Sequence, residues 1–205
     1  MKFVQKFTLV ALSVAFFATF AHAAYKVDNK IYLDKSDFSA AHALLKRNGI
    51  TLKTGSNLRL KNGYKVMGYY KYDSVTTTRT RYLGDKVVGT DVSKKETHII
   101  VIANIKYLKQ LRTCFEDRDC YSLQVFTMYH ELGHFLINKD GNLPRAIKGT
   151  EMEERLADRV GLNIMQMRGV SVPHIMHRNG MYKAIFTLDE DLVDYSYEVM
   201  KYLKQ

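Results

Sequence analysis

Residues 130–134 read His-Glu-Leu-Gly-His, a pattern that can hold a metal ion and use it for chemistry. On a helix, residues four apart lie on the same face, so His130 and His134 can bind one zinc ion through ring nitrogens. Glu131 stands beside the first histidine, where its carboxylate can take a proton from metal-bound water. The pattern therefore predicts metal-assisted hydrolysis with Glu131 as the catalytic base. The alternative is a helix with two surface histidines and a solvated glutamate.

A catalytic zinc site usually has three protein ligands and one open position, so a third ligand is needed. The best candidate is Glu154, which follows His134 by 20 residues and starts a second predicted helix. Asp158 lies one turn further on the same face, where it can accept the ring N–H of a metal-bound histidine. The alternative is an exposed acidic helix start that favours the helix dipole, and we expect only that role for Glu151 and Glu153.

These two segments resemble the motifs of a known enzyme family. Residues 130–134, followed by Glu-Arg-Leu-Ala-Asp-Arg-Val-Gly-Leu at 154–162, resemble the gluzincin zinc metallopeptidases, most of all the group that contains HtpX and its periplasmic relatives. The resemblance covers about residues 123–170, and the gap between the motifs is short, as in thermolysin-like enzymes. It implies a zincin-like fold with one zinc ion, the ligands His130, His134 and Glu154, the base Glu131 and the orienting acid Asp158.

A second zinc motif overlaps the first. Metzincins read H-E-x-x-H-x-x-G-x-x-H, occasionally with Asp in the last place. Here Ile137 stands where that motif has Gly, Asp140 stands in the last place, and residues 173–177 resemble a metzincin Met-turn. Ile137 cannot easily adopt the sharp turn that glycine allows. Glu154 is therefore preferred, and Asp140 stays the alternative third ligand.

The beginning of the chain has the layout of a secretory signal peptide. Lys2 and Lys6 form a positive start, residues 7–20 are almost entirely apolar, and Ala-His-Ala at 21–23 is a small-x-small cleavage pattern. The apolar stretch is short for a membrane span, which needs about 20 residues; an uncleaved N-terminal anchor is the alternative. We predict a signal peptide over residues 1–23, export to the periplasm or the medium, and a single domain over residues 24–205.

Cys114 and Cys120 are the two cysteines of the chain, separated by a polar, loop-like segment. An exported protein meets an oxidising environment, so we predict a disulfide that closes this loop. A metal site on the two thiols is the weaker alternative, because their spacing exceeds the usual paired-Cys zinc spacing of two to four residues.

The formal charge is +10, and removal of Lys2 and Lys6 with the signal peptide leaves +8. The basic residues are scattered, without the runs or aromatic interleaving of nucleic-acid-binding proteins. The charge favours weak attraction to anionic envelope surfaces, and no nucleic-acid partner is expected. An exported surface-binding domain in which the His-Glu motif is fortuitous is a further alternative.

The pattern of elements predicts an α+β fold. Residues 34–48 favour a first helix, with Ser36 or Asp34 as its cap. Residues 50–103 favour a mostly antiparallel sheet, with turns at Asn62-Gly63, Gly84-Asp85 and Gly89. The second half favours helices, over residues 105–113, 121–139, 150–168 and 189–203.

The remaining candidates concern substrate and transition state. His174, His177 and Tyr182 are candidate donors to the oxyanion formed when water attacks a carbonyl, with solvated loop residues as the alternative. An exposed strand over residues 97–103 is expected to take up the substrate as an added extended strand. The sequence thus predicts an exported zinc metalloendopeptidase that cleaves a peptide or protein substrate. The alternative is an inactive zincin-fold protein of the cell envelope that binds metal or another protein.

Overall fold

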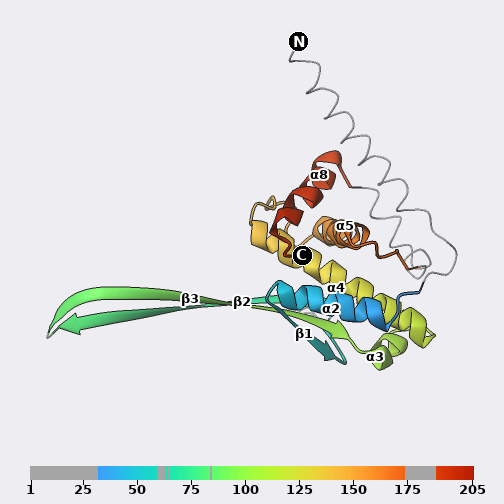
Figure 1. Ribbon diagram of the computed structural model, residues 1–205, viewed down its shortest axis with the longest axis horizontal. Helices are drawn as coiled ribbons and strands as arrows, with labels where there is room; N and C mark the ends of the chain where they lie inside the picture. The colour runs from blue at the N-terminus through green and yellow to red at the C-terminus, as the bar shows by residue number, and fades with distance from the viewer. Residues whose placement is uncertain (1–31, 60–62, 64, 84, 174–187) are drawn as a thin grey trace, which may run out of the picture.

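The predicted α+β fold class is confirmed by a computed structural model that describes residues 32–59, 63, 65–83, 85–173 and 188–205. An N-terminal helix and a three-stranded mixed sheet precede a helical half (Figure 1). Within these ranges, no helix is long and apolar enough to cross a membrane. The predicted signal peptide lies outside the described residues.

The first helix, α2 (Lys35–Arg47), begins and ends where local chemistry predicts. The Asp34 carboxylate accepts hydrogen bonds from the backbone N–H groups of Ser36 and Asp37. The Asp37 carboxylate accepts one from the Asp34 N–H, which completes a capping box. Asn48 is the C-cap, followed by Gly49 at a positive φ of 74°. The apolar side of α2 packs on strand β1 (Ile50–Gly55) and on helix α4 (Asp117–Asp140).

The sheet contains β1 (Ile50–Gly55), β2 (Gly68–Leu83) and β3 (Lys86–Ala103) in the order β1-β3-β2. β3 is parallel to β1 and antiparallel to β2. The prediction that residues 97–103 form an exposed strand is wrong, because residues 98–102 pair with β1 on one side and with β2 on the other. A continuous apolar run is typical of such a central strand, in which Ile100 and Ile102 are fully buried.

β2 and β3 continue far beyond the helices as a two-stranded ribbon (Figure 1). We call residues 74–96 the arm. None of its described residues belongs to the hydrophobic core. The turn predicted at Gly89 is wrong: β3 runs through this residue, next to a bulge at Arg81/Tyr82. A glycine in a strand often accompanies a bulge rather than a turn.

Helix α4 (Asp117–Asp140) carries the His-Glu motif and is buried on most of its sides. It follows α3 (Ile105–Gln110) and starts four residues earlier than predicted, because Asp117 and Asp119 favour the positive end of a helix. Cys120 therefore lies in the first turns of α4, where the predicted disulfide joins it to Cys114. The helix ends at Gly141, whose φ is 75°.

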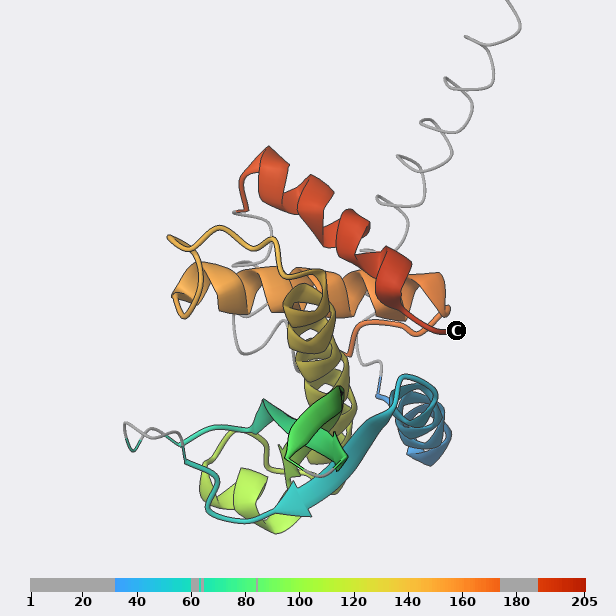
Figure 2. The same cartoon turned by 90° about the vertical axis from the view of Figure 1, so that its left-hand side faces the viewer.

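α4 lies between the sheet and helix α5 (Glu151–Met167), as Figures 1 and 2 both show. The crossing of α4 and α5 is close because two glycines face the partner backbone. A Cβ added at Gly133 would lie 2.5 Å from the Ala157 carbonyl oxygen, and one at Gly161 would lie 3.0 Å from the Tyr129 backbone. The chain ends with α8 (Glu190–Glu198) and the 3₁₀ helix η1 (Val199–Tyr202), which pack on α5 and α4.

Candidate metal centre

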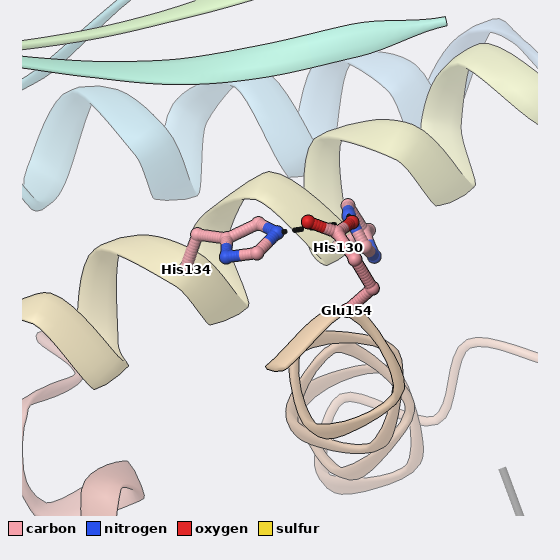
Figure 3. A group of neighbouring side chains, drawn as sticks. All are labelled: His130, His134 and Glu154. Atoms are coloured by element: carbon pink, nitrogen blue, oxygen red, sulfur yellow. Dashed lines mark ion pairs between the residues drawn. The ribbon is translucent and has the colours of Figure 1, made fainter. Parts of the chain in front are cut away.

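The three candidate ligands His130, His134 and Glu154 come together at the crossing of α4 and α5 (Figure 3). The Oε2 atom of Glu154 lies 3.3 Å from Nε2 of His130 and 3.5 Å from Nε2 of His134. A tetrahedral zinc ion with bonds of about 2.0–2.1 Å separates its donor atoms by roughly 3.3 Å. Two of the three donor separations match this value, and all three donor atoms lie within 4.8 Å of one another, so the group is able to hold a metal ion.

Local structure and helix packing place these side chains. His130 and His134 are four residues apart on α4, so their rings project from one face. Glu154 belongs to the first turn of α5, which the Thr150 side chain caps by accepting a hydrogen bond from the Met152 N–H. The close approach of Gly133 to the α5 backbone brings this first turn over the two histidines.

Asp158 contacts His130, one of the two partners that the sequence suggested. Its Oδ1 atom lies 2.7 Å from Nδ1 of the ring, and the aspartate side chain is 13% exposed. A carboxylate accepts hydrogen bonds, so the proton of the neutral ring sits on Nδ1 and leaves Nε2 able to bind a metal ion, whereas in the protonated ring Nε2 donates to Glu154. One hydrogen bond thereby sets both the tautomer and the orientation of His130.

Glu153 has a role at the site that the sequence analysis did not assign. Its Oε1 atom lies 3.7 Å from Nδ1 of His134, and its other oxygen accepts a hydrogen bond from the Gly149 N–H. Glu153 thus bonds the N–H that stands one residue before the N-cap Thr150. Each histidine consequently has an acidic residue beside its Nδ1 atom, and each directs Nε2 toward Glu154. The only sequence signal for Glu153 was its position next to Glu154.

The carboxylates around the histidines stabilise positive charge. Burial opposes protonation of both rings, but hydrogen bonds to acidic groups outweigh it, and they raise the pKa of His130 well above its usual value and that of His134 to about 9. Conversely, hydrogen bonds from His130 and His134 lower the pKa of Glu154. A cluster that favours a cation between its donor atoms is suited to a divalent metal ion as well as to protons.

Glu131 lies beside this group, between α4 and the beginning of β2. Its side chain is 4% exposed, and burial raises its pKa, although a backbone hydrogen bond from Tyr70 partly offsets the effect. Gly68 permits the close approach of β2, because a Cβ there would lie 2.5 Å from Thr127 Cγ2 and 3.0 Å from Glu131 Oε1. A carboxylate whose pKa is raised toward neutrality is a stronger general base.

A cavity of about 540 Å³ opens next to these side chains. His130, Glu131, Glu154 and Asp158 line one part of it. The rest is formed by the approach to β2, the segment after α3 and one turn of α4, with the side chains Lys65, Val66, Met67, Leu111, Thr113, Phe126 and Thr127. The sequence does not reveal this wall, because the segments that build it are adjacent only after folding.

Asp140, the alternative third ligand, lies away from the group. Its carboxylate accepts a hydrogen bond from the Tyr195 hydroxyl at 2.8 Å and lies 3.5 Å from the Lys201 Nζ atom. Among the described residues, the His-His-Glu group is the cluster able to hold a metal ion. The candidate oxyanion donors His174, His177 and Tyr182 lie outside the described residues.

Searches against protein-family models, curated proteins and solved structures found no match for this chain. The fold and the site together therefore define the class to which it can be assigned. It is an α+β protein with a buried helix crossing that presents a His-His-Glu group able to hold a metal ion.

Proposed function

We propose that the protein is an exported, zinc-dependent metallopeptidase of the gluzincin type. The observation that carries the proposal is the convergence of the two histidine Nε2 atoms on Glu154 Oε2, with Glu131 beside them on the wall of the same cavity. Two imidazoles and one carboxylate are a donor set of catalytic zinc sites, which keep a fourth position open.

Zinc in such a site polarises a substrate carbonyl and lowers the pKa of water to about 7. The residues of the chain supply the remaining steps. Glu131 accepts the proton of the attacking water on its carboxylate and delivers it to the nitrogen of the leaving amine. Asp158 and Glu153 hold the rings of His130 and His134 in their orientations throughout.

The substrate backbone is bound along β2 in this proposal, in place of the strand predicted at residues 97–103. β2 is the edge strand of the sheet, and it begins at Gly68, which lines the cavity. An extended peptide can add to such an edge through main-chain hydrogen bonds.

Export is supported by two observations. Residues 1–23 have the layout of a signal peptide, and Cys114 is joined to Cys120 by a disulfide, which persists in oxidising compartments.

The first experiment measures metal by mass spectrometry on protein purified without a metal-affinity tag. We expect about one zinc ion per chain in the wild type and its loss in Glu154→Ala, because two histidines alone leave the ion poorly held. Glu151→Ala is the matched control, since this glutamate lies in the same first turn and its side chain is 78% exposed. A wild type that takes up no metal after incubation with zinc would refute the proposal.

The second experiment measures hydrolysis of reduced and alkylated serum albumin. Glu131→Gln should retain zinc and lower the rate by about 10²–10⁴-fold, the usual contribution of a general base. Cleavage at the wild-type rate by this variant would remove the peptidase assignment. The protein would then be a metal-binding or interaction protein of the cell envelope.

A further inference from the structure

In the sheet order β1-β3-β2, no other described strand pairs with the outer edge of β2, although near the site the Tyr70 N–H on this edge donates to Glu131. The strand starts at Gly68 on the wall of the cavity and continues to Leu83 in the arm, with a regular register as far as the bulge at Arg81/Tyr82. The candidate active site and the arm therefore share one continuous edge.

The register shows which backbone groups this edge offers. Ala103 N–H donates to the Met67 carbonyl at 2.7 Å, so Met67 and Ala103 form a hydrogen-bonded antiparallel pair. Because such pairs alternate, the even-numbered residues from Gly68 to Thr80 direct N–H and C=O away from β3. The backbone hydrogen bond from Tyr70 to Glu131 independently supports this direction.

From Ser74 to Thr80 the edge of β2 lacks the usual protection of an exposed strand, since the bulge at Arg81/Tyr82 lies beyond this stretch. Natural edge strands are commonly blocked by lysine, proline or a covering element. The outward positions of β2 in the arm carry Ser74, Thr76, Thr78 and Thr80, none of which is charged or proline. Both faces of the ribbon also show apolar side chains, with Val75 60% and Val92 66% exposed. A ribbon of two strands is at best marginally stable alone, so a third strand would stabilise it.

We propose that the β2 edge of the arm extends the substrate site and binds a polypeptide segment as an added strand. This inference rests on the proposed peptidase function and names its substrate class: long, extended protein segments rather than short peptides. The stretch from Gly68 to Thr80 spans roughly 40 Å at about 3.3 Å per residue. A substrate must therefore provide about twelve extended residues beside the cleaved bond to reach the outer part of the arm.

The test compares two synthetic peptides around one cleavage site mapped in reduced and alkylated serum albumin. One has 6 residues, and the other has 24 residues with the cleaved bond at its centre, which covers the arm in either strand direction. We expect kcat/KM to be about tenfold or more higher for the long peptide, because only that peptide reaches the arm.

Two matched variants distinguish which of the two edges of the arm binds the long peptide. Thr80 and Thr90 are directly opposite each other, and the N–H of each points outward, on opposite edges of the ribbon. Thr80→Pro removes one outward donor on β2 and is expected to lower kcat/KM for the long peptide by roughly two- to tenfold. It should leave the short peptide unchanged, and Thr90→Pro should change neither value. Zinc content and thermal unfolding verify that both variants fold.

Three outcomes would overturn the inference while leaving the peptidase proposal intact: equal kcat/KM for both peptides, equal effects of the two prolines, or a wild-type dimer that Thr80→Pro dissociates. In the last case the edge holds a second copy of the chain. If albumin is not cleaved, the peptidase proposal fails, and fluorescence anisotropy with a labelled 24-residue albumin peptide tests binding to the arm separately. Binding that Thr80→Pro alone weakens supports the edge as a polypeptide site, whereas no binding or equal binding by all three proteins refutes it.

Discussion

The α4–α5 crossing and the arm are stabilised in opposite ways. At the crossing, two helices meet backbone to backbone through Gly133 and Gly161, and neighbouring side chains such as Leu132 and Leu156 are almost fully buried. In the arm, Leu83, Val87 and Val92 are more than half exposed. The arm is held together mainly by the backbone pairing of β2 with β3. The geometry of the metal centre therefore depends on tight packing, whereas substitutions in the arm can be made without disturbing that geometry.

The largest effect is expected at Gly133. In Gly133→Val the new side chain would begin 2.5 Å from the Ala157 carbonyl oxygen, so α5 must move away. We expect a loss of about 3 kcal/mol in the free energy of unfolding, together with loss of zinc binding, because Glu154 moves with α5. Urea denaturation and metal analysis measure the two effects.

The matched variant in the arm is Gly89→Val. A Cβ there would meet the end of the Arg81 side chain, with Nη2 at 3.1 Å, and this flexible group can move aside. The expected change is less than about 0.5 kcal/mol. Similar losses for both glycine variants would contradict the contrast between crossing and arm.

A second, smaller effect concerns the disulfide at the start of α4. It closes a short loop between Cys114 and Cys120 and so restricts the unfolded chain by about 2 kcal/mol. Dithiothreitol should therefore lower the Tm of the wild type by several degrees, as measured by circular dichroism. The double variant Cys114→Ala/Cys120→Ala should have the lower Tm already and should not respond. An equal response from both proteins would show that the reductant acts elsewhere.

At the C-terminal end of α4, we expect a contribution to stability that depends on pH. Burial raises the pKa of Asp140, but hydrogen bonds from Tyr195 and the Asn142 backbone and the charge of Lys201 outweigh it and hold the pKa below its usual value. Stability from this carboxylate is thus present above the unfolded pKa, about 3.9, and is lost as the pH falls through the folded pKa. Tyr195→Phe should cost about 1.5 kcal/mol at pH 7 and less at pH 3. Urea denaturation at both pH values measures this difference. An equal loss of stability at pH 7 and pH 3 would show that ionised Asp140 is not the cause of the loss.

Removal of the whole arm is also expected to have only a small effect on stability. Asp73 and Thr97 are directly opposite, so an Asn-Gly turn can replace residues 74–96 between them. We expect a change of less than about 1 kcal/mol in the free energy of unfolding and unchanged zinc content, because none of the described residues of the arm belongs to the core. Hydrolysis of the 6-residue peptide should persist, while the advantage of the 24-residue peptide disappears. Loss of zinc in this variant would show that the arm and the crossing are coupled.

Features that depend on residues within one helical turn were predictable from the sequence. The caps of α2 at Asp34 and of α5 at Thr150 follow from side chains that bond N–H groups two or three residues away. The spacing of His130 and His134 likewise follows from the period of a helix. The beginning of α4 was less predictable, because its polar residues suit both a loop and a helix N-terminus.

The sequence by itself determined the helix caps, the motif face of α4, the disulfide pair and the candidacy of Glu154 and Asp158. Tertiary structure alone decided that residues 98–102 lie in the centre of the sheet, that β2 is the edge beside Glu131, and that Glu153 stands at His134. It also decided that Asp140 accepts a hydrogen bond from Tyr195 and does not lie at the metal centre. The physical reason is that caps and helix faces arise from neighbours in sequence. Strand order and the approach of α5 to α4 depend on partners far along the chain, and the period of a strand is the same at an edge as in the centre.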